Sequence, residues 1–190
     1  FFIRRRTALS QELFDNQKRM KKLILTVCHG NMQRSVIAEH CINRELQQSG
    51  LDDRYRVLSR GTQGTESDKD PPPKHKNLRH YENEWLLAKP VLEEIGITIP
   101  IDQEATPIDA LVVEEATIII AMERAVLLAS PNSLICQFPS SGYKMRMFTE
   151  LENKADDIAD LYGQKDSATV RREILRIESI VKTHFKQLTA

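Results

Sequence analysis

One short segment of the sequence groups a cysteine, an arginine and a serine at a spacing that suits nucleophilic attack on an anionic ester. The residues between Cys28 and Arg34 are His29, Gly30, Asn31, Met32 and Gln33, and Ser35 follows Arg34 directly. A loop of this length can turn successive backbone N–H groups inward, and the N-terminus of a following helix adds partial positive charge. Residues 28–35 are therefore expected to bind a tetrahedral anion such as phosphate.

The side chains of this segment would each have a distinct part in that chemistry. The thiolate is the nucleophilic form of cysteine, and inward-pointing N–H groups together with the Ser35 hydroxyl would stabilise it on Cys28. The planar guanidinium of Arg34 can hold two phosphate oxygens at once, which a lysine cannot do. Gly30 lets the backbone come close to the anion, and Asn31 tolerates a left-handed conformation.

The same spacing has a simpler interpretation, in which Cys28 is a buried cysteine before a turn and Arg34 lies on a helix surface. The spacing of the two residues alone does not decide between these interpretations. The context favours the anion-binding loop, because an apolar run precedes Cys28 and a helical pattern begins directly after Arg34.

The segments around this loop alternate between strand and helix patterns. Residues 23–27 form a continuous apolar run, as expected for a strand that is covered on both faces. Residues 35–48 place their apolar side chains on one helical stripe. Further strands are predicted over residues 55–59, 116–122 and 144–148, and further helices over residues 84–95 and 167–187. This order of elements predicts an α/β fold.

A length of 190 residues suits one domain with a single core. Residues 61–83 are polar and proline-rich, and they are predicted to be a loop excursion within that domain rather than a linker. Residues 9–19 place apolar side chains at helical spacing, which indicates a short amphipathic helix before the domain. We therefore divide the chain into an N-terminal helical extension, residues 1–19, and one domain, residues 20–190.

Charge and apolar content exclude several classes of protein. Lys+Arg and Asp+Glu are equal at 27 each, so a uniformly basic nucleic-acid binder is not indicated. No apolar run approaches the ~20 residues of a membrane span, and residues 1–6 lack the pattern of a secretory signal. The three cysteines contain no C-x-x-C pair, which favours a reducing cytoplasm over a disulfide framework or zinc cluster. Neither nucleic acid nor a membrane is expected as a partner.

Residues 27–39 closely resemble the signature V-C-x-G-N-x-C-R-S-P-x-A-E of the low-molecular-weight protein tyrosine phosphatase family. Residues 58–62 are similar to the second strand of that family and its S-A-G-T turn, and residues 116–122 to its third strand. Residues 157–163 are similar to its D-P-Y-G general-acid loop. The resemblance extends from about residue 21 to residue 185.

The resemblance implies a single three-layer domain, a four-stranded parallel sheet with helices on both faces and the phosphate-binding loop after the first strand. It also implies hydrolysis of a phosphomonoester through a phosphocysteine, with a phosphotyrosine protein or a small aryl phosphate as substrate. Cys28 would attack phosphorus, while Arg34 and the loop amides hold the equatorial oxygens. Asp160 would protonate the leaving oxygen and then activate water. No metal ion and no other cofactor are expected.

The sequence departs from the family pattern at positions close to this chemistry. Gln33 stands where the family often carries a second loop cysteine, so we expect no protective disulfide between Cys28 and its own loop. Leu161 replaces the proline after the acid, which predicts a less rigid acid loop. Asp156 and Asp157 remain alternative candidates for the acid.

The sequence leaves two other function classes open. Arsenate reduction on the same scaffold would need a resolving thiol near Cys28, either within the protein or from a small thiol, whereas Cys41 is expected to be a buried side chain of the predicted helix. A catalytically weak phosphate-binding regulatory module would follow if Asp160 were misplaced. Tyr81 and Trp85 are interpreted as core aromatics rather than as lining of a substrate cleft. The oligomeric state and the physiological substrate are not indicated.

Overall fold

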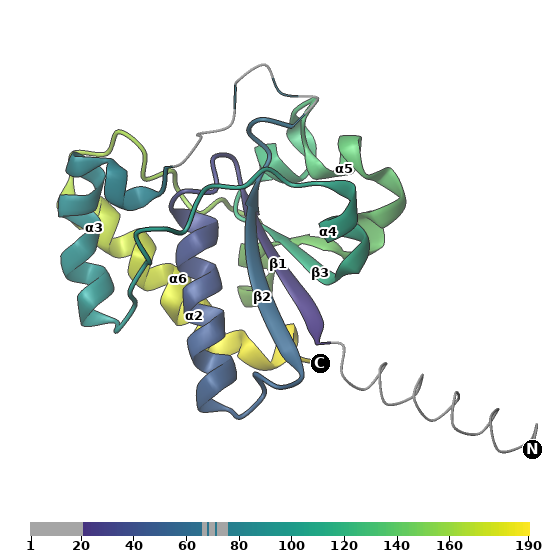
Figure 1. The fold of residues 1–190 in the computed structure, drawn as a ribbon, viewed down its shortest axis with the longest axis horizontal. Coiled ribbons are helices and arrows are strands. Elements are labelled where there is room, and N and C mark those ends of the chain that lie inside the picture. Colours follow the sequence, from purple (N-terminus) through teal and green to yellow (C-terminus); the bar gives the residue numbers. More distant parts are fainter. Residues whose placement is uncertain (1–20, 66–67, 69–70, 72–75) are drawn as a thin grey trace, which may run out of the picture.

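A parallel four-stranded sheet forms the centre of the computed structural model, which describes residues 21–65, 68, 71 and 76–190 (Figure 1). Its strands are β1 (Lys22–Cys28), β2 (Tyr55–Gly61), β3 (Ala116–Ala121) and β4 (Met145–Met147). They lie in the order β2-β1-β3-β4, and every neighbouring pair is parallel. The predicted four-stranded parallel sheet is confirmed.

Strand β1 is central and has no solvent-exposed face. Residues 23–27 are each at most 1% exposed, because helices cover the sheet on both sides. The strand pairs with β2 along its whole length, as far as Cys28 opposite Gly61. A continuous apolar run suits a parallel strand that is buried on both faces, which is why the sequence pattern located it correctly.

Helices cover both faces of the sheet, as predicted (Figure 1). One face carries α2 (Arg34–Gln48), α3 (Glu82–Glu94) and α6 (Ser167–Leu188). The other face carries α4 (Ala110–Glu115), α5 (Leu134–Gln137) and a π-helical turn, η2 (Ala125–Ala129). Alternate residues of β1 serve the two cores, with Ile24 in the first and Leu25 in the second. The fold is thus the three-layer α/β arrangement.

Several short helices lie where the sequence pattern predicted no helix, among them the 3₁₀ helices η1 (Leu78–His80), η3 (Pro139–Lys144) and η4 (Phe148–Glu152). Helix α4 shows the reason most clearly. Its six residues run directly into the apolar strand β3, so their periodicity cannot be separated from that of the strand. Its one local signal is the N-cap Asp109, whose Oδ1 accepts a hydrogen bond from Val112 N at 2.9 Å.

The structure changes the limits of one predicted segment and does not test those of another. The loop excursion predicted over residues 61–83 contains η1 and the start of α3, which begins at Glu82 rather than at residue 84. Residues 1–20 lie outside the described residues, so the helix over residues 9–19 and the division of the chain into an extension and a domain stay predictions. Within the described ranges, no helix is long and apolar enough to cross a membrane.

Candidate active site

The segment with the cysteine and the arginine joins β1 to α2 at the carboxyl edge of the sheet. Cys28 is the last residue of β1 and Arg34 is the first of α2, so residues 29–33 form the turn between them. Strand β1 has β2 on one side and β3 on the other, so the strand order reverses at this point. Open α/β sheets bind ligands at such reversals, beyond the carboxyl ends of their strands.

The Cys28 thiol lies at the base of this turn, within reach of two hydrogen-bonding groups. Its sulfur is 3.0 Å from Ser35 Oγ, and the backbone N–H of Asn31 donates to it at 3.3 Å. The residue is only 3% exposed. These two contacts fix the position of the sulfur at the base of the turn.

Asn31 holds the turn in shape through both its backbone and its side chain. Its φ of 52° lies in the left-handed region, as the sequence predicted. Its Oδ1 accepts a hydrogen bond from Thr106 N at 2.8 Å, and its Nδ2 donates to Ser35 Oγ at 3.3 Å. Asn31 therefore connects Ser35, and through it Cys28, to the segment that precedes α4.

The back of the turn lies against the end of β2. A Cβ at Gly61 would be 2.6 Å from the carbonyl oxygen of His29, which is closer than side chains come to backbone. The N–H groups of Thr62 and Gln63 donate to the carbonyl oxygens of Cys28 and His29 at 3.1 and 2.9 Å. Glycine at position 61 is what allows these two backbones to approach and pair.

Arg34 is 3% exposed and is held from three directions. Its Nη1 donates to the carbonyl oxygen of Ile158 at 3.1 Å, and its Nη2 lies 2.9 Å from Glu123 Oε1 and 3.3 Å from Asp160 Oδ1. Burial by itself lowers the pKa of Arg34, but negative charge on Cys28, Glu123 and Asp160 outweighs it, so this pKa lies above its ordinary value. The result is a permanently charged guanidinium beside the thiol.

Glu123 is a site residue that the sequence pattern did not reveal. It lies two residues after the end of β3, the strand that pairs with β1. Side chains that follow parallel strands gather at the carboxyl edge of a sheet, and this position was the one available signal.

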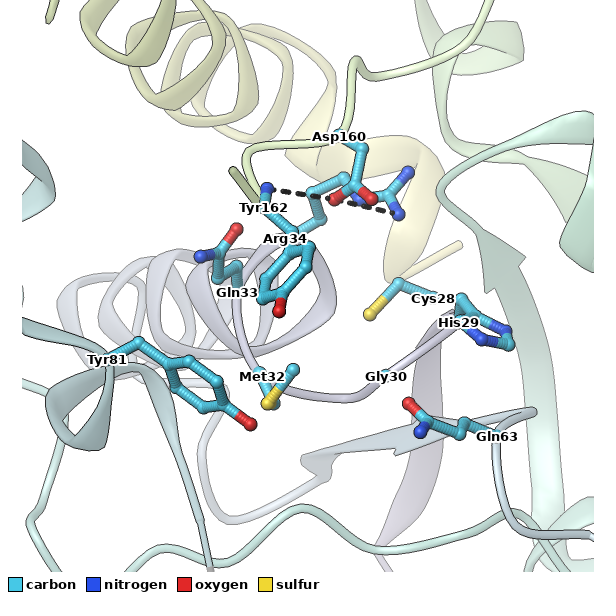
Figure 2. A pocket seen from close by; sticks show the side chains of 10 residues that line it. All are labelled: Cys28, His29, Gly30, Met32, Gln33, Arg34, Gln63, Tyr81, Asp160 and Tyr162. Carbon is cyan, nitrogen blue, oxygen red and sulfur yellow. Dashed lines mark hydrogen bonds and ion pairs between the residues drawn. The ribbon is translucent and has the colours of Figure 1, made fainter. Parts of the chain in front are cut away.

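A pocket of about 280 Å³ opens above the turn, and Figure 2 shows the side chains around it. The Cys28 sulfur points into the pocket, and the paired side chains of Arg34 and Asp160 lie close together at one side of it (Figure 2). Of the residues predicted to bind phosphate, those that line the pocket are His29, Gly30, Met32, Gln33 and Arg34. Asn31 and Ser35 support the turn instead.

Of the three aspartates considered for the acid, Asp160 is the one that lines the pocket. Asp156 lies 2.9 Å from Arg176 of α6, and its hydrogen bond with that guanidinium lowers the pKa of Asp156. Asp157 Oδ1 accepts a hydrogen bond from Arg124 N at 2.7 Å. The structure thus brings Asp160 to the turn and engages the other two elsewhere.

The segment around Asp160, residues 158–163, is called the acid loop below. Two apolar side chains anchor it, because Ile158 is fully buried and Leu161 is 3% exposed in the core shared by α2, α3 and α6. The Leu161 side chain is thus buried where the family has a proline, and the lower rigidity expected for the loop stays a prediction. Between these anchors, the side chain of Asp160 is 58% exposed.

Tyr81 and Tyr162 form an aromatic wall of the pocket, with their rings edge to face and the centroids 6.0 Å apart (Figure 2). Burial, followed by the nearby Tyr162 and Glu84, raises the pKa of Tyr81. The interpretation of Tyr81 as a core aromatic needs correction, because this side chain faces the pocket. Trp85 does pack against the core, as expected. The one available signal for Tyr81 was its place at the end of the long loop, directly before α3.

The other two cysteines do not line the pocket. Cys41 is fully buried in α2, and this burial raises its pKa to about 12. Cys136 lies exposed in α5, on the opposite face of the sheet from α2. In the part of the chain that the structure describes, no group of three or more His, Cys, Asp or Glu residues could hold a metal ion.

The doubly wound sheet, the anion-binding turn and the meeting of a thiol, a guanidinium and a carboxyl group at one pocket define a class, the cysteine-dependent phosphomonoester hydrolases. The model of the family "Low molecular weight phosphotyrosine protein phosphatase" matches residues 23–190. The chain belongs to this family and is a phosphatase. The resemblance seen in its motifs is confirmed.

Solved structures share the fold. The low molecular weight protein tyrosine phosphatase of T. tengcongensis is 20% identical, with a TM-score of 0.69 over 88% of this chain and 99% of that one. The YwlE arginine phosphatase of Geobacillus stearothermophilus is 22% identical, with a TM-score of 0.63 over 88% and 93%. Vibrio vulnificus Wzb, solved with benzylphosphonate, is 20% identical, with a TM-score of 0.63 over 88% and 99%. A search of curated proteins gave no match.

Proposed function

We propose that this phosphatase acts on phosphotyrosine in proteins, or on small aryl phosphates, through a phosphocysteine at Cys28. One observation carries the proposal. The Cys28 sulfur, the Arg34 guanidinium and the Asp160 carboxyl group meet at a single pocket, and that pocket has an aromatic wall. A nucleophile, an oxyanion-binding group and a proton donor are the three parts that phosphoryl transfer from an ester needs.

The reaction follows from these positions in two steps. In the first, Cys28 Sγ attacks phosphorus, the S–P bond forms, the bond from phosphorus to the ester oxygen breaks, and Asp160 gives its proton to that oxygen. In the second, Asp160, now a carboxylate, takes a proton from a water that attacks phosphorus, and cleavage of the S–P bond releases phosphate. Arg34 and the backbone N–H groups of the turn hold the non-bridging oxygens throughout.

The pocket lining supports an aromatic leaving group over a guanidinium one. Met32, Tyr81 and Tyr162 present apolar or aromatic surface, on which a phenyl ring can pack edge to face or stack. A phosphoarginine side chain would need hydrogen-bond acceptors for its remaining N–H groups. Among the described residues that line the pocket, Asp160 has the only carboxyl group, and it is already paired with Arg34, so the side-chain amide acceptors left are the neutral oxygens of Gln33 and Gln63.

The alternatives from the sequence gain less support. Arsenate reduction with a resolving thiol from within the protein is not supported, because neither Cys41 nor Cys136 lines the pocket, and reduction with a small thiol is left to the assay below. A weak phosphate-binding module was expected only for a misplaced acid, whereas Asp160 lies at the pocket. All three cysteines are free, which supports our inference that the protein works in a reducing compartment such as the cytoplasm.

A comparison of three substrates with the wild-type protein tests the proposal. We expect kcat/KM to be highest for a phosphotyrosine peptide, lower for a phosphoarginine peptide, and turnover of arsenate with a thiol reductant to be slow. Cys28→Ser should abolish hydrolysis but still bind inorganic phosphate in calorimetry, since the turn amides and Arg34 remain, and Cys136→Ser should match the wild type. A higher kcat/KM for phosphoarginine, or residual activity of Cys28→Ser above a few per cent, would refute it.

A further inference from the structure

Glu173 of α6 is a buried carboxylate directly beneath the acid loop. It is 5% exposed, and its Oε2 accepts a hydrogen bond from the backbone N–H of Ala159 at 3.2 Å. Its Oε1 accepts from Arg172 Nε at 3.0 Å, and the side chain of Arg172 is 63% exposed. The buried contact of this carboxylate is thus with the residue immediately before Asp160.

Burying the Glu173 carboxylate at this position costs free energy of folding. A buried carboxylate loses its hydration, and an ion pair with a solvent-exposed arginine restores little of that loss. A leucine or methionine at position 173 would suit the apolar core around α6 better. The carboxylate instead supplies a hydrogen-bond acceptor for the backbone N–H of Ala159, which lies outside the sheet.

Three backbone groups of the two residues before Asp160 form hydrogen bonds. Ile158 N donates to Met122 O at 3.0 Å, and Ile158 O accepts from Arg34 Nη1 at 3.1 Å. The bond from Ala159 N to Glu173 continues this series up to the acid itself. Since the Asp160 side chain is 58% exposed, few packing contacts fix it, and its position depends on the backbone that carries it.

We propose that Glu173 is a positioning residue for the general acid, which it holds at the leaving oxygen by fixing the Ala159 peptide. This inference rests on the proposed function, in which Asp160 donates the proton. Proton transfer in the transition state needs a donor within hydrogen-bond distance of the leaving oxygen, so a small shift of the loop removes most of the benefit. Among the described residues, Glu173 makes no hydrogen bond to residues 28–35. Arg34, which also contacts the Ile158–Ala159 peptide, keeps its contact with Glu123, so phosphate binding should change little.

Three single variants separate this role from a structural one. Glu173→Ala removes the acceptor, whereas Glu173→Gln keeps a carbonyl oxygen that can accept from Ala159 N. Glu178→Ala is the matched control, because Glu178 is a largely buried carboxylate on the same helix that pairs with Arg44 and Lys182 and not with the acid loop. Each variant is assayed by kcat/KM on phenyl phosphate and on 2,4-dinitrophenyl phosphate, and by inhibition with inorganic phosphate.

We expect Glu173→Ala to lose about 10-fold or more in kcat/KM on phenyl phosphate and only about 2-fold on the dinitrophenyl ester, whose departing oxygen needs no proton. Inhibition by phosphate should stay unchanged, Glu173→Gln should recover most of the loss, and Glu178→Ala should behave as the wild type. Equal losses on both esters, no recovery with glutamine, or the same loss in Glu178→Ala would overturn the proposal.

The double variant Glu173→Ala/Asp160→Asn distinguishes failure of this inference from failure of the proposed function. If Glu173 acts through the acid, the double variant should be no slower on phenyl phosphate than Asp160→Asn alone. Additive losses would refute positioning while leaving the acid role of Asp160 intact. If Asp160→Asn itself shows no dependence on the leaving group, the proposed function is wrong in its acid, and this inference fails with it.

Discussion

Arg34 and Asp160 form an ion pair beside the pocket, with Nη2 of the arginine 3.3 Å from Oδ1 of the aspartate. The same nitrogen lies 2.9 Å from Glu123 Oε1. A phosphate that enters the turn therefore meets a guanidinium that already has two carboxylate neighbours. The anion and Asp160 compete for one face of Arg34, whereas Glu123 can keep its contact.

Asp160→Asn should show a steep dependence on the leaving group. General acid catalysis contributes ~10²–10⁴-fold for a poor leaving group and little for an activated one, so the loss in kcat/KM should be large for phenyl phosphate and small for nitrophenyl esters. Asp156→Asn and Asp157→Asn are the controls, since both carboxylates bind elsewhere. If Asp157→Asn carried the dependence instead, the acid would have to be reassigned.

Arg34→Lys should lower kcat/KM by about 10²-fold, because an ammonium group cannot make the two parallel bonds of a guanidinium to the transferring phosphoryl group. Steady-state kinetics on an aryl phosphate measure this effect. Arg56→Lys, which changes an arginine paired with Glu115 outside the pocket, should leave the rate unchanged. A near-wild-type rate for Arg34→Lys would contradict the assignment.

Glu123→Gln should reduce kcat/KM by about 10-fold, and inorganic phosphate should inhibit the variant more weakly. The glutamine keeps a hydrogen bond to Arg34 but not the charge that strengthens it and orients the guanidinium. Glu115→Gln is the control, because Glu115 lies just before β3, pairs with Arg56 and does not line the pocket. Unchanged kinetics would show that Ile158 and the turn suffice to orient Arg34.

Tyr81→Ala should raise KM for a phosphotyrosine peptide by about 10-fold, with a smaller effect on kcat. The variant removes the aromatic surface against which the substrate ring would pack. Tyr143→Ala is the control, since Tyr143 is 87% exposed and does not line the pocket. An equal rise in KM for acetyl phosphate, which has no ring, would mean that Tyr81 acts on the phosphate site instead.

Cys41 should resist alkylation by iodoacetamide at pH 8, while Cys136 reacts. With a pKa of about 12, Cys41 is the neutral thiol at pH 8, and its thiolate fraction grows only as the pH rises towards 12. Cys136 is exposed. Peptide mass spectrometry of the labelled, folded protein measures both. Cys41→Ala and Cys136→Ala should each keep nearly full phosphatase activity, and labelling of Cys41 at pH 8 would contradict its burial.

The sequence predicted those features that depend on contiguous residues. Strand β1 and helix α2 follow from local periodicity, and the turn between them could be predicted because all its residues are adjacent in the chain. Glu123, Tyr81 and Glu173 could not be identified in this way, since their relation to the turn or to the acid loop exists only after separate strands and helices have packed. Asp160 was located by its motif, but its choice over Asp156 and Asp157 needed the positions of Arg176 and Arg124.

Because β1 is buried, the Cys28 side of the site should move less than the Asp160 side. Cys28 continues directly from a strand that is at most 1% exposed over residues 23–27 and lies between two neighbours, so displacing the nucleophile means opening the sheet. Amide hydrogens of β1 should therefore exchange with deuterium only on global unfolding. Asp160 lies outside the sheet, and its side chain is 58% exposed. Adjustment to substrates of different shape is therefore expected from the Asp160 side chain and not from the Cys28 sulfur.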